Sequence, residues 1–488
     1  MLVEPKVQES PLGLRSNCLP FPEVLAQSVA NIAPTVTPTV NAALVFASAG
    51  NGTWLTYLIA TVGLVFVGLN INQFAQRSAA PGSLYMYIAR GLGPMAGVIT
   101  GWALMLAYFL TAIAVAAGFA NYGDVLLSPL GITPSPIFLM AICVGIAWYI
   151  AYRDIQLSTV LMLLLEIVSV ATIILLGLIV VFKKGYAIDM AQLTLKDTPP
   201  SGIVSGLVLG VFSFVGFESA TTLGTEAKKP LRNIPKAVIL STVTCGLFFV
   251  LMSYIEVLGF SGLATPFNKS AAPTSDLATA AGVGFFGVII LIGSMVSLFA
   301  CTLACINAGA RILFSMGQHG IFHHRIGHAH GTNRTPYVAV TISCLIVFLL
   351  PTVTTFFGVK PLDNYAYAGT VATYGFLVAY LLISIAAPIY LARQRQLQFS
   401  NVAVSVLAII FMLIPTLGSI GVPGNGFLSQ IFPIPAAPYN VFPYLFLIYL
   451  ALGGVWFAMI RARSPRIIQQ MEADIEAAHA RFGEMKKV

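Results

Sequence analysis

Long apolar stretches recur along the whole chain and are separated by short polar connections. Each stretch is about as long as the roughly 20 residues that an α-helix needs to cross the hydrocarbon core of a bilayer. None alternates with a period of two, and backbone groups inside a membrane must be paired within helices, so strands are excluded. We therefore predict an all-α polytopic membrane protein with twelve transmembrane helices, over residues 23–48, 53–75, 95–121, 135–152, 157–182, 201–224, 236–260, 281–316, 337–357, 365–391, 401–421 and 441–461.

The composition supports this prediction. Hydrophobic residues make up 58% of the 488 residues and charged residues only 9%, against about 25% charged residues in an average soluble protein. So few charges exclude a soluble enzyme, a disordered chain and a nucleic-acid-binding protein. Residues 1–22 do not resemble a cleavable signal peptide. Five of the six cysteines lie in apolar runs, where buried, inert thiols are the expectation.

Positive charges predict the orientation. With the N-terminus in the cytoplasm, 20 of the 25 lysines and arginines fall on the inner side of the membrane. Cytoplasmic loops carry such an excess, so we expect a multi-pass protein of the cell membrane with both termini cytoplasmic. Residues 1–22 would form a cytoplasmic N-terminal segment, and residues 464–488 a cytoplasmic amphipathic tail. The five remaining positive charges are lysines assigned to the outer side of the membrane: Lys183, Lys184, Lys196, Lys269 and Lys360.

Two of the predicted helices contain helix-breaking sequence at mid-membrane depth. Pro34 and Pro38 interrupt the first, since proline removes a backbone donor, and Gly216 and Glu218 interrupt the sixth. Each broken helix opens a block of five helices, over 23–182 and 201–391, so the second block is inverted relative to the first. Broken helices at matching positions of inverted halves indicate the binding site of a secondary transporter. Their half-helix ends attract anions and cations, which suits an amino acid zwitterion.

Three motifs resemble those of the amino acid–polyamine–organocation superfamily of transporters. The most specific is FSFVGFESATTLGTEAKKPLRNIPK over 212–236, and APGSLYMYIARGLGPMAGVITGW over 80–102 and the segment 307–320 support it in the same order. The resemblance covers about residues 20–460. It implies the LeuT-like fold, a five-plus-five inverted repeat with broken helices 1 and 6, followed by two accessory helices over 401–461. It also implies an amino acid permease that works by alternating access, as a symporter or an antiporter.

The first break departs from the family pattern. Many members have a Gly-Ser-Gly type of break whose backbone amides hold the substrate carboxylate, whereas this chain has Ala33-Pro34-Thr35. Pro34 has no amide to offer, so either the carboxylate site is rearranged or the substrate differs from a standard amino acid. The residues expected to bind substrate lie at the two breaks: Asn31, Ile32, Ala33, Pro34, Thr35, Phe212, Ser213, Val215, Gly216 and Glu218.

For several single residues, both a functional and a structural role are possible. The resemblance makes Phe212 a gate over the substrate, while packing is the other interpretation. Glu218 and Glu166 are candidates for proton coupling or for structural hydrogen bonding, and we favour Glu218 because it lies in the motif. Glu256 is expected to be a structural acid near the outer interface.

Charged residues at the cytoplasmic ends complete the prediction. The resemblance implies an inner network of Glu226, Arg232 and Arg311, with static helix capping as the alternative. The histidines after residue 318 are interpreted as a solvated connector and not as a metal site.

The predicted partners are a small amino acid or amine, protons as the candidate coupling ion, and the lipid bilayer. No nucleotide-binding loop occurs, so we expect no direct use of ATP. We expect no cofactor and no enzymatic activity. A membrane enzyme or a channel is the alternative, but the intramembrane acids lie on separate helices and the inverted repeat does not suit a symmetric pore.

Overall fold

The computed structural model describes residues 14, 16–78, 82, 84–153, 155–469 and 471–473, and at 155–163 and 165 only the backbone is described. Most of the predicted segments 1–22 and 464–488 therefore lies outside the described residues. Within these residues the regular structure is helical, apart from one isolated parallel bridge between Leu19 and Ala227. The all-α prediction is confirmed.

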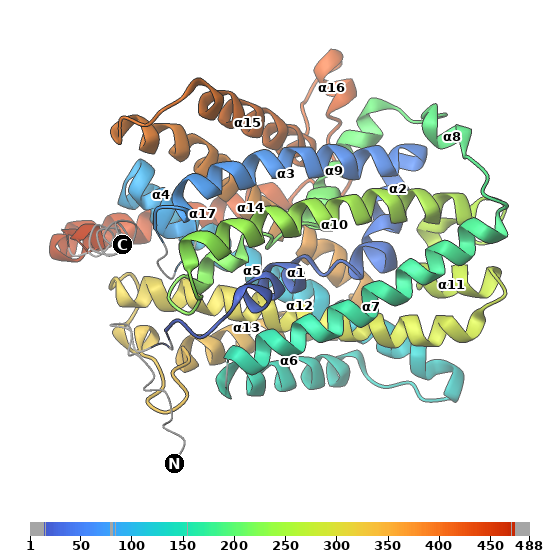
Figure 1. Cartoon of the computed structure of the whole chain (residues 1–488), viewed down its shortest axis with the longest axis horizontal. Coiled ribbons are helices and arrows are strands. Elements are labelled where there is room, and N and C mark those ends of the chain that lie inside the picture. The colour runs from blue at the N-terminus through green and yellow to red at the C-terminus, as the bar shows by residue number, and fades with distance from the viewer. Residues whose placement is uncertain are drawn as a thin grey trace.

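The long helices run roughly side by side along the longest axis of the molecule (Figure 1). The first block contains α1 (Phe21–Ile32), η1 (Thr37–Asn41), α2 (Ala42–Ala49), α3 (Thr53–Ala75), α5 (Pro94–Leu127), α6 (Pro136–Arg153) and α7 (Ile155–Lys183). The second contains α9 (Pro200–Phe212), η4 (Ser219–Leu223), α10 (Pro230–Phe260), α12 (Gly284–Gln318), α13 (Tyr337–Phe356) and α14 (Pro361–Arg393). The accessory helices are α15 (Phe399–Ile420) and α17 (Phe442–Arg463). Short helices connect them: η2 (Gly50–Gly52), α4 (Leu84–Leu92), η3 (Ser128–Leu130), α8 (Met190–Leu193), η5 (Phe267–Lys269), α11 (Pro273–Ala280), η6 (His324–Gly327) and α16 (Phe427–Ile431).

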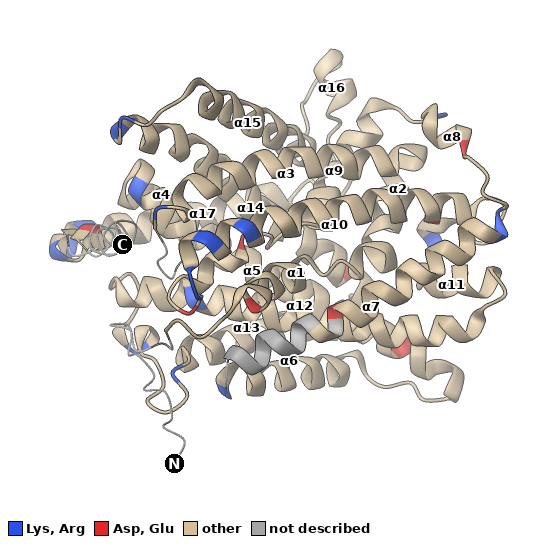
Figure 2. Ribbon diagram, in the orientation of Figure 1, with Lys and Arg blue, Asp and Glu red and all other residues tan. Residues whose placement is uncertain are grey.

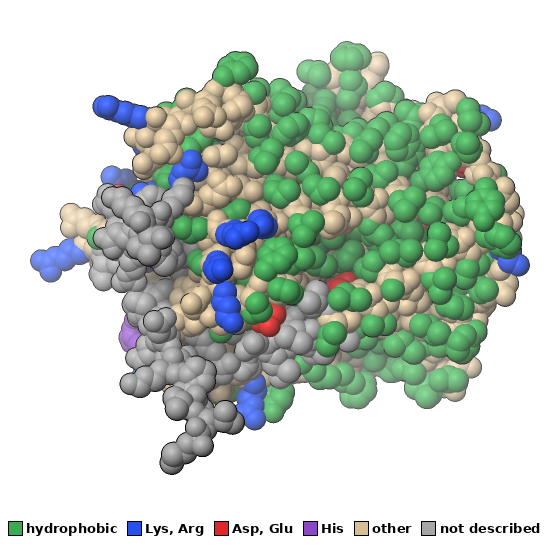
Figure 3. All heavy atoms as spheres, viewed as in Figure 1, with side chains coloured by type: hydrophobic (Ala, Val, Ile, Leu, Met, Phe, Trp, Pro, Cys, Tyr) green, Lys and Arg blue, Asp and Glu red, His purple; other side chains and the backbone are tan. Residues whose placement is uncertain are grey.

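The twelve predicted spans correspond to helices of this arrangement. Ten segments of the described chain are long and apolar enough to cross a membrane, with Phe21–Ala75 counted as one segment that holds the first two predicted spans. The sixth predicted span is represented by the shorter apolar helix Pro200–Phe212. Hydrophobic side chains cover most of the face seen in Figure 3, as a lipid-exposed surface requires. The chain is a multi-pass membrane protein.

Both predicted breaks are present. Helix α1 ends at Ile32 because Ala33 adopts a left-handed conformation with φ +48° and Pro34 follows it. A left-handed non-glycine residue costs about 1–2 kcal/mol, so the surrounding packing has to hold it. The sixth span is not one helix over 201–224, since α9 ends at Phe212 and a series of turns precedes η4. Gly216 supplies φ +85° within these turns.

Helix α5 lies at the centre of the bundle, where it packs most extensively against α12 and α14. Small residues permit this close approach: a Cβ atom on Gly375 would lie 2.4 Å from the carbonyl oxygen of Ala103. Helix α1 packs against α7, α10 and α12, so the first break is enclosed by helices of both blocks.

Charge is unevenly distributed between the two ends of the bundle. The chain enters α1 and leaves α17 at the same end, and most of the lysines and arginines gather there (Figure 2). The opposite end, near α8 and α11, carries few. The assignment of this end to the cytoplasm stays a prediction.

Candidate substrate site at the two helix breaks

The two broken helices contact each other directly. A Cβ atom on Gly216 would lie 2.6 Å from Cβ of Asn31, so only glycine allows the second break to approach the first this closely. Ser28 donates a hydrogen bond to the carbonyl oxygen of Phe217 over 2.7 Å, and its hydroxyl accepts one from the backbone N–H of Ala220. The inner half-helices are thus joined through side chain and backbone.

All ten residues expected to bind substrate are buried at this junction. Among eight of them the exposed fraction reaches no more than 4%, at Ile32 and Phe212, and Pro34 and Gly216 are buried as well. The members are Asn31, Ile32, Ala33, Pro34, Thr35, Phe212, Ser213, Val215, Gly216 and Glu218.

Glu218 is held from two sides by tyrosines of other helices. Tyr108 on α5 donates to one carboxyl oxygen over 2.6 Å, and Tyr380 on α14 donates to the other over 2.8 Å. The carboxyl group is fully buried. Neither tyrosine was singled out from the sequence, where the available signal was a phenolic hydroxyl in the middle of an apolar helix.

Glu166 connects the first break to α7 and α12. Its carboxyl oxygens accept hydrogen bonds from Thr35 over 3.2 Å and from Ser297 over 2.5 Å. Thr35 belongs to the break itself, so this carboxyl is hydrogen-bonded directly to helix 1. Ser297 was not anticipated, since serine is common in apolar helices.

Phe212 lies against α14 at the outer side of the second break. Its ring meets that of Tyr365 edge to face, with 6.0 Å between the centroids. A Cβ atom on Gly369 would lie 2.7 Å from the Phe212 ring, so this glycine makes room for it.

A hydrogen-bond network lies beside this aromatic contact. Tyr365 donates to the side-chain oxygen of Asn41 over 2.7 Å, and the Asn41 amide donates to Ser213 over 3.0 Å. Tyr365 and Asn41 therefore link α14 and the outer half of helix 1 to the second break.

Asn31 is held by two cysteines of α12. The Cys305 thiol donates to the side-chain oxygen of Asn31 over 2.9 Å, and the Cys301 thiol donates to its backbone oxygen over 3.3 Å. The expectation that both thiols are buried is confirmed. Their contact with the first break was not predicted.

Two residues of the predicted inner network, Glu226 and Arg311, form an ion pair. Arg311 forms two hydrogen bonds to the Glu226 carboxylate, over 3.0 and 2.8 Å, and both side chains are 1% exposed. Arg232 is exposed and makes no ion pair with the described residues. Its membership of the network stays a prediction.

One further prediction stays open and one needs correction. Glu256 lies near the end of α10, as expected, where it is fully buried, and neither carboxyl oxygen has a hydrogen-bond partner among the described residues. His319 is also buried and lies 2.9 Å from the Tyr85 hydroxyl, so it does not belong to a solvated connector. No group of three potential metal-binding side chains occurs in the described part of the chain.

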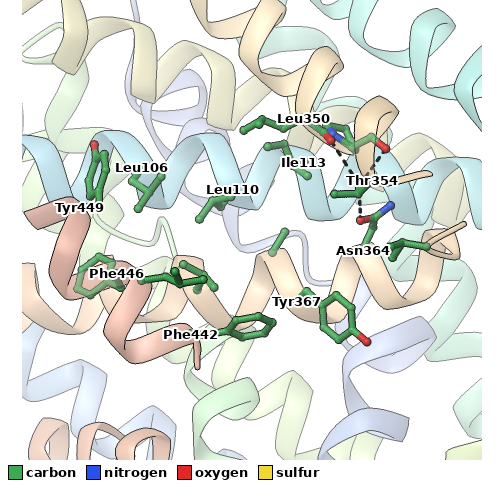
Figure 4. A pocket seen from close by; sticks show the side chains of 15 residues that line it. Leu106, Leu110, Ile113, Leu350, Thr354, Asn364, Tyr367, Phe442, Phe446 and Tyr449 are labelled. Atoms are coloured by element: carbon green, nitrogen blue, oxygen red, sulfur yellow. Dashed lines mark hydrogen bonds between the residues drawn. The ribbon is translucent and has the colours of Figure 1, made fainter. Parts of the chain in front are cut away.

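A separate cavity of about 430 Å³ lies between α5, α13, α14 and α17 (Figure 4). Its lining is almost entirely apolar, with Leu106, Leu110 and Phe446 along its length. Where polar groups occur, Thr354 and Asn364 are hydrogen-bonded to each other. None of the predicted site residues lines it, and it offers nothing to bind a zwitterion.

A sequence model of the family described as amino acid permease matches residues 23–467. The chain belongs to the amino acid permease family. The prediction of a secondary transporter of amino acids or related amines is confirmed at this level.

Individual relatives are distant. The chain is 27% identical to the branched-chain amino acid permease BcaP of Bacillus subtilis (strain 168), over 75% of this chain and 80% of the relative. It is 26% identical to the low-affinity putrescine importer PlaP of Escherichia coli (strain K12), over 60% of this chain and 65% of the relative. Both are transporters by name.

Similarity to a solved structure supports the predicted fold of this amino acid permease. A Na⁺-coupled sialic acid symporter, in a substrate-bound outward-open state, superposes with a TM-score of 0.52 at 13% identity. The match covers 82% of this chain and 91% of the symporter. The predicted LeuT-like architecture is confirmed.

Proposed function

We propose that this protein imports or exchanges a small molecule with an ammonium group, an amino acid or related amine, by alternating access at the two helix breaks. The observation that carries the proposal is Glu218, a fully buried carboxyl at the second break held by Tyr108 and Tyr380 from two other helices. The names of relatives, a branched-chain amino acid permease and a putrescine importer, favour substrates of this class.

Charge compensation suggests how transport is coupled. An ionised carboxylate in a membrane protein interior is costly unless a cation neutralises it. The hydrogen-bond partners of Glu218 and Glu166 in the described part of the chain are neutral: hydroxyl groups at both acids, with backbone groups in addition at Glu218. The remaining compensating groups are a proton and the ammonium group of the substrate. Proton binding at one of these acids would therefore be linked to substrate binding, and we favour Glu218.

The remaining roles follow from the arrangement. Phe212 would close over the substrate from the outer side, and the Glu226–Arg311 pair would hold the inner side closed. The blocks 23–182 and 201–391 would move relative to each other around the breaks. The positive-charge excess favours the cell membrane, with both termini in the cytoplasm.

Glutamine variants test the coupling. Glu218→Gln and Glu166→Gln keep the shape of the side chain but cannot release a proton. In proteoliposomes, the variant of the coupling acid should retain exchange of radiolabelled substrate and lose accumulation driven by a pH gradient. Glu256→Gln is the matched control, because this acid is equally buried but its carboxyl oxygens have no hydrogen-bond partner among the described residues.

The alternatives give different results. Unchanged pH-driven accumulation in both variants would exclude both acids as the coupling group. Accumulation that requires a sodium gradient and ignores pH would replace proton coupling by sodium coupling. Uptake of no amino acid or amine by the wild type would contradict the proposed function.

A further inference from the structure

The side-chain amide of Asn31 has an unused donor at the junction of the two breaks. Its oxygen accepts from Cys305, but its nitrogen has no partner among the described residues, although the side chain is only 2% exposed. Leaving a buried donor unpaired costs about 1–3 kcal/mol. Such a group is retained where a ligand completes its hydrogen bonding.

The nitrogen faces the second break. A Cβ atom on Gly216 would lie 3.4 Å from the amide nitrogen and 2.9 Å from the amide carbon of Asn31. Gly216 therefore packs directly against this amide, and the second break is the part of the chain that the amide nitrogen lies beside.

The two thiols determine which end of the amide faces this space. Cys301 and Cys305 are one helical turn apart on α12, with their sulfur atoms separated by 4.0 Å. Because the Cys305 thiol donates to the side-chain oxygen, the –NH₂ group is directed away from α12. The Cys301 thiol holds the backbone oxygen of the same residue, which limits rotation of the whole residue.

The backbone of the first break offers no free N–H group at Ala33 or Pro34. Ala33 donates its backbone N–H to the carbonyl oxygen of Val29, and Pro34 has no N–H. Both are therefore unable to hold an anionic group. We propose that the Asn31 amide, oriented by Cys301 and Cys305, donates the hydrogen bond that holds the substrate carboxylate. The inference rests on the proposed function and narrows the substrate to an amino acid in preference to its decarboxylated amine.

Binding to the purified protein tests this directly. Wild-type protein is screened by thermal shift against the common L-amino acids and, for each hit, against the amine formed by its decarboxylation. Asn31→Asp replaces the donor by an acceptor of the same shape. It should weaken amino acid binding about 10- to 100-fold, the effect of one hydrogen bond to a charged group. Binding of the amine should not weaken, because a carboxylate at this position attracts its ammonium group and the amine has no carboxylate to repel.

The cysteines provide a second test that does not alter Asn31. Cys305→Ala removes the hydrogen bond that orients the amide and should weaken amino acid binding selectively. Cys305→Ser restores a donor and should recover most of this loss. Cys344→Ala, at a buried cysteine on α13, is the control for loss of a buried thiol.

The outcomes separate this inference from the proposed function. Equal losses for the amino acid and its amine in Asn31→Asp, or no recovery in Cys305→Ser, would overturn the inference alone. Binding of neither class by folded wild-type protein would overturn the proposed function and this inference with it.

Discussion

At the scale of single residues, the site is built from groups whose positions depend on neighbours far away in sequence. Glu218 is held by Tyr108 and Tyr380, which lie 110 and 162 residues away. Pro34, Gly216 and Glu218 could be identified from the sequence because proline, glycine and a charge are each unusual in mid-membrane. The tyrosines could not, because an aromatic residue in an apolar helix carries no local sign of its partner.

Phe212 provides a prediction at this scale. Its ring is 4% exposed and lies against Tyr365 and Gly369. If the ring closes over bound substrate, Phe212→Ala should raise the dissociation rate of substrate about tenfold or more, since a buried aromatic contact stabilises by about 0.5–1.5 kcal/mol beyond its buried area. Phe212→Tyr keeps the ring and should retain slow dissociation, measured by filter binding in proteoliposomes.

Loss of any buried ring also destabilises the fold, by about 3–5 kcal/mol. Phe74→Ala is the matched control, because Phe74 is equally buried but stacks between Tyr87 and Tyr390, away from the breaks. Equal dissociation rates in the Phe212→Ala and Phe74→Ala variants would assign Phe212 to packing alone.

At the scale of helices, the apolar pattern predicts position well and helix ends less well. The spans predicted over 95–121 and 365–391 are the longer helices Pro94–Leu127 and Pro361–Arg393. The additional residues of both helices lie outside the apolar stretches. The position of a helix end there depends on packing against other helices. The sixth span differs more, because its turns after Phe212 are held by contacts with α1 that a single sequence does not reveal.

The C-terminal end of α12 illustrates packing that the sequence did not suggest. Beyond α17, Met471 is fully buried and accepts a weak hydrogen bond from Tyr85, whose hydroxyl also contacts His319. Ile467 packs near Gly320, where a Cβ atom would lie 3.3 Å from it. The start of the tail is therefore attached to α4 and to the end of α12.

This attachment should depend on pH. Burial lowers the pKa of His319 from 6.5 to about 4. The folded protein therefore binds fewer protons than the unfolded chain between these values, and stability present above pH 6.5 is lost as the pH falls towards 4. His319→Gln should flatten this part of the Tm-versus-pH curve of purified protein. His324→Gln, at an exposed histidine, is the control, and parallel curves for all three proteins would contradict the prediction.

At the scale of the whole molecule, three segments contact one another at the end of the bundle where the chain enters α1. The Glu226–Arg311 pair joins the linker after η4 to α12. The chain before α1 adds to the same place, where the backbone N–H groups of Cys18 and Leu19 donate to the carbonyl oxygen of Glu226. If this end opens in the inward-facing state, as we propose, these segments have to separate, and the pair would contribute to the balance between states.

Removal of one partner should lower stability more than removal of both. Arg311→Met leaves the Glu226 carboxylate buried and uncompensated, which costs about 3–5 kcal/mol, and should lower Tm. The double variant Glu226→Gln/Arg311→Met removes both charges and should recover most of this loss. Because the attraction that holds the inner segments together is then absent, the inward-open population should rise at the same time.

Cysteine labelling distinguishes the two effects. Ala220 is fully buried in η4, next to the first helix. In a background without native cysteines, Ala220→Cys should react faster with a thiol reagent applied from the cytoplasmic side when the double variant replaces the pair. Equal Tm values with unchanged labelling would mean that the pair is a static connection. Recovered Tm with faster labelling would mean that it stabilises the closed inner side without being needed for folding.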